Sequence, residues 1–416
     1  MEDVGRFTVL YRDSSGIIWA GSNGYGLQKY SPSLHRFHTL FPGNSLNNVL
    51  LLDTKGNLLT EFNGLRMDAD MLSNHMLYPL RDLINKRSRL TVNRNGNLWF
   101  ATEHVGKGQI QVFRYTGPDQ GKWTLVFSTP IAVISSLSMI TDDVDRLWLA
   151  HAAALLEYTP ENQRLKLFKY PNSLPGNLII NSIAQTAGNQ IWIGTEDGLI
   201  RAKPAADTMT FSLLQNSPGN IQCIQGNHVT QLITDPKDPY LLWIATNGGG
   251  LSRLDTRSMR FRHFNTRTGF PDNVIYGVLP DNNGLLWMSS NKGLIRLDPA
   301  TGAIENFTVK DGLPTDEFNQ KAMGKKPDGT LLFGGLKGLV AFNPKDFSNN
   351  PVTPRVRITG LEINNRSVSY SDSTGILDQT IEFTKKLTLP YTQNSIGLHF
   401  AALEYMIPSK INSGIT

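Results

Sequence analysis

One phrase recurs eight times along the chain, and this repetition constrains the fold more than any other feature of the sequence. The clearest copy spans residues 188–200, with a turn, a short apolar run around Trp192, a tight turn ending at Gly198 and a second apolar run. The copies are anchored at Trp19, Leu59, Trp99, Trp148, Trp192, Trp243, Trp287 and Phe333, so successive anchors lie 40 to 51 residues apart. Repeats of about 40–50 residues that each hold about four short strands are typical of a β-propeller.

The tryptophans of the repeat have a structural explanation. Each copy is too short to bury its own apolar face, so neighbouring copies must cover one another. A large flat side chain with one polar edge suits the layer between two such blades. Six of the seven tryptophans stand at equivalent repeat positions, so we interpret them as structural rather than catalytic.

The repeats leave the number of blades open. Eight copies could close a ring of eight blades. They could also form seven blades, with the first copy belonging to a preceding propeller, or one blade could be shared between the chain ends. We favour seven, because the turn Gly24-Tyr25-Gly26 of the first copy differs from the Gly-Leu turns of the later copies.

The pattern changes after the proline-containing linker at residues 349–354, where a two-residue alternation of apolar side chains replaces the repeat. Such alternation indicates half-buried antiparallel strands. About five fit between Arg355 and Tyr405, including one that carries Ile381 and Phe383, whereas an immunoglobulin-like sandwich needs about seven. We therefore predict an all-β fold, with a β-propeller of seven or eight blades over residues 1–348 and an incomplete immunoglobulin-like β-sandwich over residues 349–416.

The composition excludes several classes of protein. The net charge is +5 over 416 residues, and the densest basic run, residues 85–89, is too short for a nucleic-acid-binding patch. The single cysteine, Cys223, excludes an internal disulfide and a thiolate metal site. No run of 18 apolar residues is present, and the first residues lack the apolar segment of a signal peptide. We expect either a cytoplasmic protein or a fragment of a longer one, and both chain ends favour the fragment.

No catalytic or metal-binding constellation stands out. The eight histidines are scattered without metal-ligand spacing, and no Gly-x-Ser-x-Gly elbow occurs. The run Asn247–Gly250 resembles a phosphate loop, but it stands at the repeat position of the other tight turns. The acidic turns at Asp13 and Asp281 lack the spaced ligands of a calcium loop. We therefore expect no catalytic residue, no metal and no cofactor.

A binding face is easier to predict. In a propeller, the loops that enter each innermost strand and the turns that join the second and third strands open on one face, and such loops suit recognition. Amides, carboxylates and cations there suit a polar, hydroxyl-rich ligand. The predicted ligand-binding residues are Asn181, Asn227, His228, Asn273 and Asn319 from entry loops, with Arg66, His104, Glu196, Asp197, Asn247, Asn291 and Lys292 from turns. The alternative is that each asparagine caps its own turn.

The phrases at residues 188–200 and 281–295 resemble the two-component-regulator propeller repeat. Residues 358–365 and 389–405 look like the start of the tyrosine-rich (Y_Y_Y) immunoglobulin-like domain that follows such propellers. The pair of domains, which covers residues 6–408, is characteristic of periplasmic sensor regions of hybrid two-component system histidine kinases of the Bacteroidetes type. The sequence departs from that pattern at residues 411–416, where a tyrosine-rich strand leading to a membrane helix and the kinase is expected.

This resemblance implies a non-catalytic ligand-sensing module, commonly for carbohydrate fragments, in the periplasm as part of a receptor anchored in the inner membrane. The implied partners are an oligosaccharide or other polar small ligand, and a second copy of the receptor through the sandwich. No nucleic acid and no membrane contact by this stretch of chain are implied. The alternative is a propeller enzyme, a lyase or glycosidase acting on polysaccharide at the channel mouth, which rests on analogy of fold alone.

Overall fold

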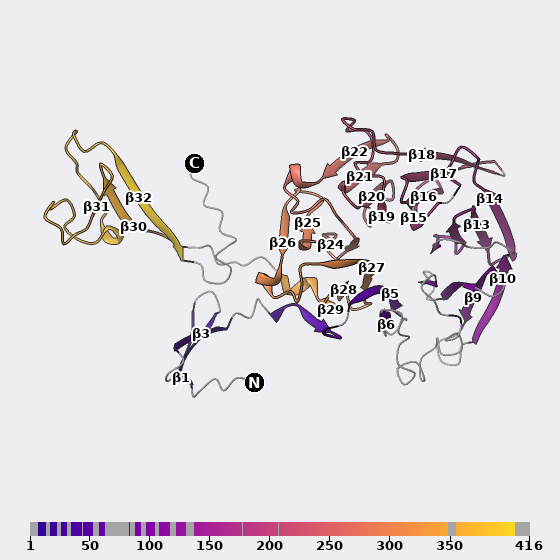
Figure 1. The fold of residues 1–416 in the computed structure, drawn as a ribbon, viewed down its shortest axis with the longest axis horizontal. Coiled ribbons are helices and arrows are strands. Elements are labelled where there is room, and N and C mark those ends of the chain that lie inside the picture. Colours follow the sequence, from indigo (N-terminus) through magenta and orange to yellow (C-terminus); the bar gives the residue numbers. More distant parts are fainter. Residues whose placement is uncertain are drawn as a thin grey trace. The chain divides into compact units, whose positions relative to one another are not determined.

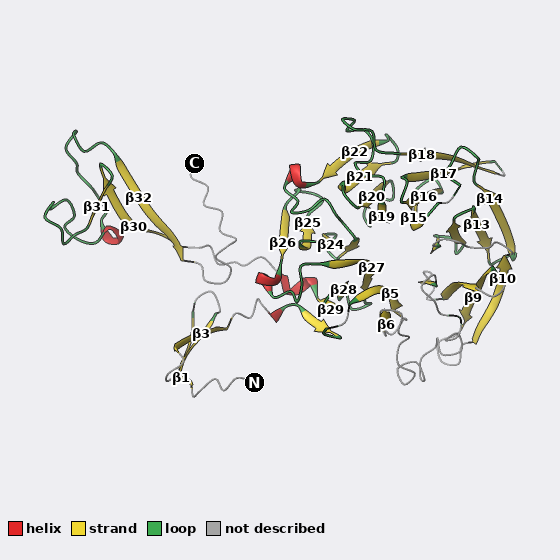
Figure 2. Ribbon diagram, in the orientation of Figure 1, coloured by secondary structure: helices red, strands yellow, loops and turns green. Residues whose placement is uncertain are grey.

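The computed structural model describes residues 7–13, 17–22, 26–30, 35–43, 45–52, 58–62, 83, 88–92, 97–104, 108–116, 122–129, 137–176, 178–206, 208–347 and 355–403. The chain divides into two compact units, one spanning Phe37–Asp346 and the other formed by Met1–Arg36 with Phe347–Thr416. Each is described by itself. The described residues are almost all strands and turns (Figure 2), and none of their helices is long and apolar enough to cross a membrane.

The described residues of the unit Phe37–Asp346 form seven antiparallel sheets, which we call blades. Within the first six blades consecutive strands pair with each other, as short connections favour, whereas the seventh blade adds β4 from the beginning of the chain. The first is β5 (Leu46–Leu52) with β6 (Leu58–Phe62); the second is β7 (Arg89–Val92), β8 (Leu98–His104), β9 (Gln109–Thr116) and β10 (Lys122–Thr129); the third is β11 (Ser138–Thr141), β12 (Leu147–His151), β13 (Ala154–Thr159) and β14 (Arg164–Lys169). The fourth is β15 (Ile180–Thr186), β16 (Gln190–Thr195), β17 (Leu199–Ala205) and β18 (Thr208–Leu214); the fifth is β19 (Val229–Thr234), β20 (Leu241–Thr246), β21 (Gly250–Asp255) and β22 (Arg260–Phe264). The sixth is β23 (Gly277–Pro280), β24 (Leu286–Ser290), β25 (Gly293–Leu297) and β26 (Ile304–Phe307); the seventh is β27 (Phe318–Lys325), β28 (Leu331–Gly335), β29 (Gly338–Phe342) and β4 (His38–Leu40).

The seven blades close into a ring (Figure 1). The first strands of the blades contact one another in the order β5, β7, β11, β15, β19, β23 and β27, and β27 contacts β5 again. β4 completes the seventh blade by pairing with β29, where Leu40 lies opposite Leu339. The structure thus combines two of the predicted arrangements, because it has seven blades and one is shared between distant parts of the chain. The compact unit starts at Phe37 rather than at residue 1, since the first copy contributes only β4 to the ring.

The anchor tryptophans fill the layers between blades, as the repeat predicts. Trp148, Trp192, Trp243 and Trp287 are at most 2% exposed. Trp192 of the fourth blade packs in one cluster with Leu232 and Ile244 of the fifth. The same relation joins the third blade to the fourth and the fifth to the sixth, so the blades from the third to the sixth share their cores with their neighbours.

Two polar contacts hold the anchor tryptophans of the third to sixth blades in place. The indole Nε1 donates to an acceptor six to eight residues upstream, which is Asp142 for Trp148, Thr186 for Trp192, Asp235 for Trp243 and Asp281 for Trp287, at 2.8–3.2 Å. An arginine guanidinium lies over the indole ring, 5.3–5.7 Å from its centroid, in each of these four blades. The buried N–H of each of these four indoles is therefore satisfied, whereas the Nε1 of Trp99 in the second blade is buried without a hydrogen-bond partner among the described residues.

Outside the ring unit, the first copy forms a three-stranded sheet of β1 (Phe7–Arg12), β2 (Ile18–Ser22) and β3 (Gly26–Tyr30). After the short helix η5 (Pro344–Phe347), a C-terminal sheet pairs β31 (Arg366–Val368), β30 (Arg355–Ile363) and β32 (Ile396–Leu403). Residues 348–354, which include the predicted linker, lie outside the described residues.

One predicted strand of the C-terminal region is wrong. Residues Ile381–Phe383 form the 3-10 helix η6 instead, and the described residues of this region contain three strands rather than about five. The alternation arose because Ile381, Leu387 and Leu389 pack from an irregular segment onto the cluster around Leu361 and Val368. One-sided packing of a loop produced the same sequence pattern as a half-buried strand.

Candidate functional site

One face of the ring is built from the entry loops of the first strands and the turns between second and third strands. In the turn after β20, the backbone nitrogen of Asn247 donates to the carbonyl of His228 at 2.9 Å. His228 lies in the entry loop of the same blade. The backbone nitrogen of Gly250 also donates to the carbonyl of Asn273, in the next entry loop, at 2.7 Å. In the next blade, Gly293 donates in the same way to Asp316 at 2.7 Å. Each turn is therefore locked between two entry loops, and together they form the face that we call the loop face.

Glycine at the end of these turns is required by a close backbone approach. Gly293 has φ +95°, and a Cβ added to it would lie 1.9 Å from the carbonyl oxygen of Phe307, at the end of the fourth strand. Gly250 has φ +78°, with the corresponding distance 2.3 Å to Phe264. A side chain at either position would push the fourth strand away. The repeated glycine is explained by packing, so it is not evidence for a phosphate site at Asn247–Gly250.

Four of the predicted asparagines support the loop face. The side-chain oxygens of Asn227 and Asn273 accept from the backbone nitrogens of Asn216 and Thr266 at 2.7 and 2.9 Å. Asn181 and Asn319 donate across blades, to the carbonyl of Val229 at 3.0 Å and to the hydroxyl of Ser45 at 3.3 Å. The contacts of Asn227 and Asn273 agree with the alternative interpretation, in which the asparagines stabilise their own loops, whereas those of Asn181 and Asn319 join two blades. Their role in ligand binding stays a prediction.

The other predicted residues lie on the turns of the same face. Exposed side chains there are Glu196, Asp197, Asn247, Asn291 and Lys292. Asn291 accepts a hydrogen bond from the hydroxyl of Tyr276 at 2.9 Å. Arg66 and the side chain of His104 lie outside the described residues.

Two predicted residues meet at the loop face. The Nε2 of His228 lies 4.0 Å from Oε1 of Glu196, which is beyond hydrogen-bonding distance. This nitrogen is buried and has no hydrogen-bond partner among the described residues. His228 belongs to the fifth blade and Glu196 to the fourth, so the ring brings together side chains from separate repeats.

Sequence reasoning missed Lys321, which lies on the innermost strand of the seventh blade. The pairing of β27 with β28 is regular at Phe318 and from Met323 onward, and Lys321 lies in the bulge between them with φ +64°. Burial and, to a smaller extent, the positive charge of Arg89 on β7 lower the pKa of its ammonium group to about 8, whereas Glu196 opposes the shift. A left-handed lysine in a bulge has no signal in the sequence, because the same residue type is common on exposed strands.

The charges that act on Lys321 of the seventh blade come from two other blades, because Arg89 is on the first strand of the second blade and Glu196 is on a turn of the fourth.

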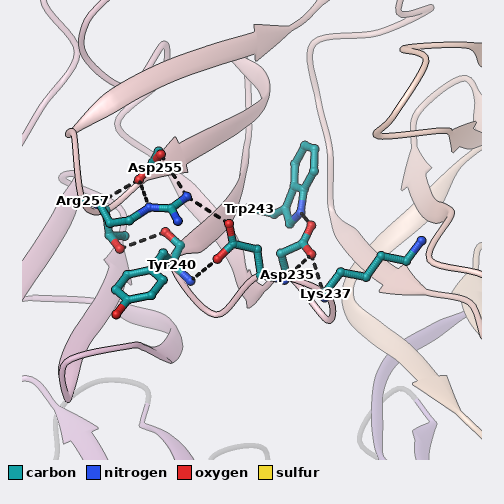
Figure 3. Close-up of polar contacts among 8 residues, drawn as sticks. Asp235, Lys237, Tyr240, Trp243, Asp255 and Arg257 are labelled. Atoms are coloured by element: carbon teal, nitrogen blue, oxygen red, sulfur yellow. Dashed lines mark hydrogen bonds and ion pairs between the residues drawn. The ribbon is translucent and has the colours of Figure 1, made fainter.

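A second polar network lies at the opposite end of the fifth blade (Figure 3). Asp235 accepts from the indole of Trp243 at 2.8 Å, and Asp238 pairs with Arg257 at 2.9 Å. Arg257 also pairs with Asp255 at 3.0 Å and lies 4.9 Å from the centroid of the Tyr240 ring. The groups in this network bond to one another, so we interpret it as support for two adjacent turns.

Among the described residues, the serine–histidine pair with hydrogen-bond spacing is inaccessible. The hydroxyl of Ser252 lies 2.8 Å from Nδ1 of His263, and Nε2 of that histidine lies 2.8 Å from the carbonyl of Ile221. Ser252 is 0% exposed, so its hydroxyl cannot meet a substrate. Among the residues that the structure describes, no group of three or more His, Cys, Asp or Glu side chains is placed to hold a metal ion.

Comparison with known proteins agrees with this fold. The family described as "Two component regulator propeller" matches residues 269–292. Histidine kinase P4 of Formosa agariphila is 26% identical over 332 residues, which is 67% of this chain and 23% of that kinase. The chain therefore spans less than a quarter of this curated relative.

Two solved structures share the architecture. The extracellular domain of a hybrid two component system of B. thetaiotaomicron has a TM-score of 0.61 at 22% identity, over 95% of this chain and 52% of that chain. YCF48 from Cyanidioschyzon merolae has a TM-score of 0.50 at 12% identity, over 74% of this chain and 99% of that chain. At these identities the two structures establish likeness of fold.

Proposed function

We propose that this chain belongs to the two-component regulator propeller family, whose model matches residues 269–292 in the sixth blade and the segment before it. The chain is a ligand-sensing module of the extracytoplasmic part of a two-component receptor and performs no catalysis itself. Support comes from the histidine kinase relative, from the fold of an extracellular domain of a hybrid system, and from the β-sheet domain that follows the ring. In the intact receptor, the state of the ligand passes through the sandwich to a kinase beyond this chain.

The loop face is the proposed binding surface, and a carbohydrate fragment is the proposed ligand. The observation that carries this proposal is the pair formed by His228 and Glu196. A buried imidazole nitrogen without a hydrogen-bond partner among the described residues costs free energy, which a ligand hydroxyl could recover. Glu196 is 42% exposed beside it and offers an acceptor for a second hydroxyl. Neighbouring polar donors and acceptors suit a hydroxyl-rich ligand.

A thermal-shift screen against oligosaccharides from plant, host and microbial glycans tests the proposal. A ligand that binds the folded state raises the melting temperature by mass action. We expect at least one class of oligosaccharide to do so, and His228→Gln or Glu196→Gln to abolish the shift. Glu161→Gln is the matched control, because Glu161 is exposed at the turn between β13 and β14 and lies outside the loop face.

The same panel separates sensing from catalysis. A sensor leaves each oligosaccharide intact after prolonged incubation, whereas a lyase or glycosidase produces new ends that chromatography detects. Turnover would overturn the non-catalytic assignment. A folded protein that shows no shift with any oligosaccharide would overturn the loop face as the ligand site.

A further inference from the structure

One position at the start of the innermost strands carries a different kind of side chain in the sixth blade. In the fourth, fifth and seventh blades it holds a short polar residue that donates to the next blade around the ring at 2.6–3.3 Å: Asn181, Thr230 and Asn319. In the sixth blade it holds Tyr276, because Thr230 bonds to the residue directly before Tyr276 just as Asn181 bonds to the residue directly before Thr230. The hydroxyl of Tyr276 has a single proton, which it donates to Oδ1 of Asn291 at 2.9 Å. Tyr276 is therefore directed to a turn of the loop face, whereas its counterparts join two blades.

Hydrogen bonds fix the position of this tyrosine ring. Asn291 is exposed on the turn between β24 and β25, and its backbone nitrogen donates to Oδ2 of Asp272 at 3.2 Å. The other carboxylate oxygen of Asp272 accepts from the backbone nitrogen of Val274 at 3.2 Å, so the turn and the entry loop are held together. Tyr276 is half-buried between them. An anchored tyrosine that is still partly exposed offers contact area to a ligand at a small cost in conformational entropy.

Short contacts connect Tyr276 to the pair formed by His228 and Glu196. Asn247 donates from its backbone nitrogen to the carbonyl of His228 at 2.9 Å, and it forms a β-bridge with Val274, two residues before Tyr276. The row from Glu196 to Tyr276 therefore crosses the fourth, fifth and sixth blades along the loop face. It has hydrogen-bonding groups at one end and an aromatic ring at the other.

A pyranose oligosaccharide matches both ends of this row. The hydroxyls at the edge of a pyranose ring pair with polar side chains. The axial C–H bonds on one of its faces form an apolar surface with a slight positive charge, which complements the negative face of an aromatic ring. Ligand sites commonly combine aromatic surfaces with a few placed polar groups. The short polar residues of the other blades offer no such surface.

We infer that Tyr276 is a specificity-determining residue of the loop face, on which one pyranose unit of the sensed oligosaccharide stacks while another unit bonds to His228 and Glu196. This inference rests on the proposed function and narrows its ligand to saccharides with six-membered rings. The hydrogen bond from Tyr276 to Asn291 orients the aromatic ring before the ligand arrives.

Isothermal titration with four neutral probes of similar size tests the inference. The probes are β-linked trimers of glucose, galactose and mannose, and a trimer of fructofuranose, whose five-membered rings lack a continuous face of axial C–H bonds. We expect at least one pyranose trimer to bind. The fructofuranose trimer should bind at least about tenfold more weakly, which corresponds to the upper range of an aromatic contact.

Variants then assign the contact to the aromatic ring. Tyr276→Asn introduces the residue that the fourth and seventh blades carry at this position, so the variant should fold, and it should bind the pyranose trimer about tenfold more weakly. Tyr276→Phe keeps the ring and should retain most of the affinity. Tyr391→Asn is the matched control, because Tyr391 is 91% exposed and lies outside the ring unit.

Proton chemical shifts of the sugar separate stacking from mere support of the loop. Protons above the face of an aromatic ring move upfield because of its ring current. We expect this shift for C–H protons of the bound pyranose trimer with the wild-type protein and with Tyr276→Phe, and its loss with Tyr276→Asn. An equal loss of affinity in Tyr276→Phe and Tyr276→Asn would assign the effect to the hydrogen bond with Asn291 and overturn the stacking.

The remaining outcomes separate this inference from the proposed function. Full affinity of Tyr276→Asn for a pyranose trimer, or a preference for the fructofuranose trimer, overturns the stacking and leaves carbohydrate sensing standing. If no pyranose trimer binds although other oligosaccharides raise the melting temperature, the pyranose assignment alone is wrong. If no saccharide of either panel binds the folded protein, both proposals are overturned.

Discussion

The first copy and the sixth blade carry the same phrase, yet they differ in burial. In both, an aspartate accepts from the indole of the anchor tryptophan, Asp13 from Trp19 at 2.8 Å and Asp281 from Trp287 at 3.2 Å. In both, a serine closes the following turn, Ser22 onto Gly26 and Ser290 onto Gly293. Strands β24 and β25 are buried throughout, whereas Leu10 and Leu27 of the first copy are 68% and 66% exposed.

This difference shows what a repeat encodes by itself. The phrase specifies the hairpin, the indole hydrogen bond and the serine turn, all of which form from contacts within about ten residues. It does not specify burial, because the layers on both sides come from adjacent blades. The phrase also does not specify which sheet its fourth strand joins. β4 follows the first copy in sequence but pairs with β29 of the seventh blade.

The largest expected effect is at the anchor tryptophans. Trp287→Ala removes a fully buried ring that packs 4.7 Å from Phe342 of the next blade, so it should lower the free energy of unfolding by about 3–5 kcal/mol. Trp19→Ala removes a partly exposed ring and should leave the main transition of the ring unit in place. Urea unfolding of both variants checks this. Equal destabilisation would show that the first copy is as fully packed as a blade.

The turn glycines give the next largest contrast. Gly293→Ala should cost about 3 kcal/mol, because its Cβ would lie 1.9 Å from the carbonyl of Phe307 and its φ is +95°. Gly26→Ala has a similar φ of +75° but no described atom within 4 Å of the added Cβ, so only the conformational cost of about 1 kcal/mol remains. The pair isolates the contribution of the fourth strand. Melting curves measure the loss of stability in each variant. Similar losses in the two variants would contradict a clash between the added Cβ and the carbonyl of Phe307.

A pH dependence of stability is expected from the third blade of the ring. His151 stands where Ser290 stands in the sixth blade, accepts from the Ala153 nitrogen at 3.1 Å, and is 1% exposed. Burial lowers its pKa from 6.5 to about 4, so between these values the unfolded state binds a proton that the folded state does not. Stability should therefore fall as pH drops from 6.5 toward 4, by about 2 kcal/mol at pH 5.

His151→Thr tests the origin of this loss. The threonine restores the hydroxyl that Thr195 and Ser290 use at the equivalent position, and it does not titrate. Unfolding midpoints at pH 5 and pH 7 should converge in the variant. An unchanged pH dependence would assign the effect to another group.

The smallest of these effects is expected at the indole acceptors. Asp281→Ala leaves the buried Nε1 of Trp287 without its acceptor and removes two backbone contacts of the turn, so about 1–2 kcal/mol should be lost. Asp281→Thr should be milder, because Thr186 serves Trp192 in the fourth blade at 2.9 Å. Asp13→Ala should cost less than Asp281→Ala, since Trp19 is partly exposed. Chemical unfolding of the three variants establishes the order.

The candidate site was only partly accessible to sequence reasoning. Glu196 and His228 were expected at the loop face, and the ring places them 4.0 Å apart. Lys321 was missed, because no local pattern marks a lysine in a strand bulge. The asparagines were visible as a recurring feature, but the bonds of Asn181 to Val229 and of Asn319 to Ser45 depend on the neighbouring blade.

By itself, the sequence determined the local units of this protein: the blades, their anchor tryptophans, the glycine turns and the end of the repeats near Phe342. These depend on periodicity and on contacts between residues close in the chain, which a repeated phrase records directly. The tertiary structure decided the number of blades, the closure of the seventh by His38–Leu40, and the approach of His228 to Glu196. Closure joins a three-residue strand to a partner about 300 residues away, and the pair joins side chains from two repeats. Such pairings are fixed by the geometry of a closed ring, which no single repeat contains.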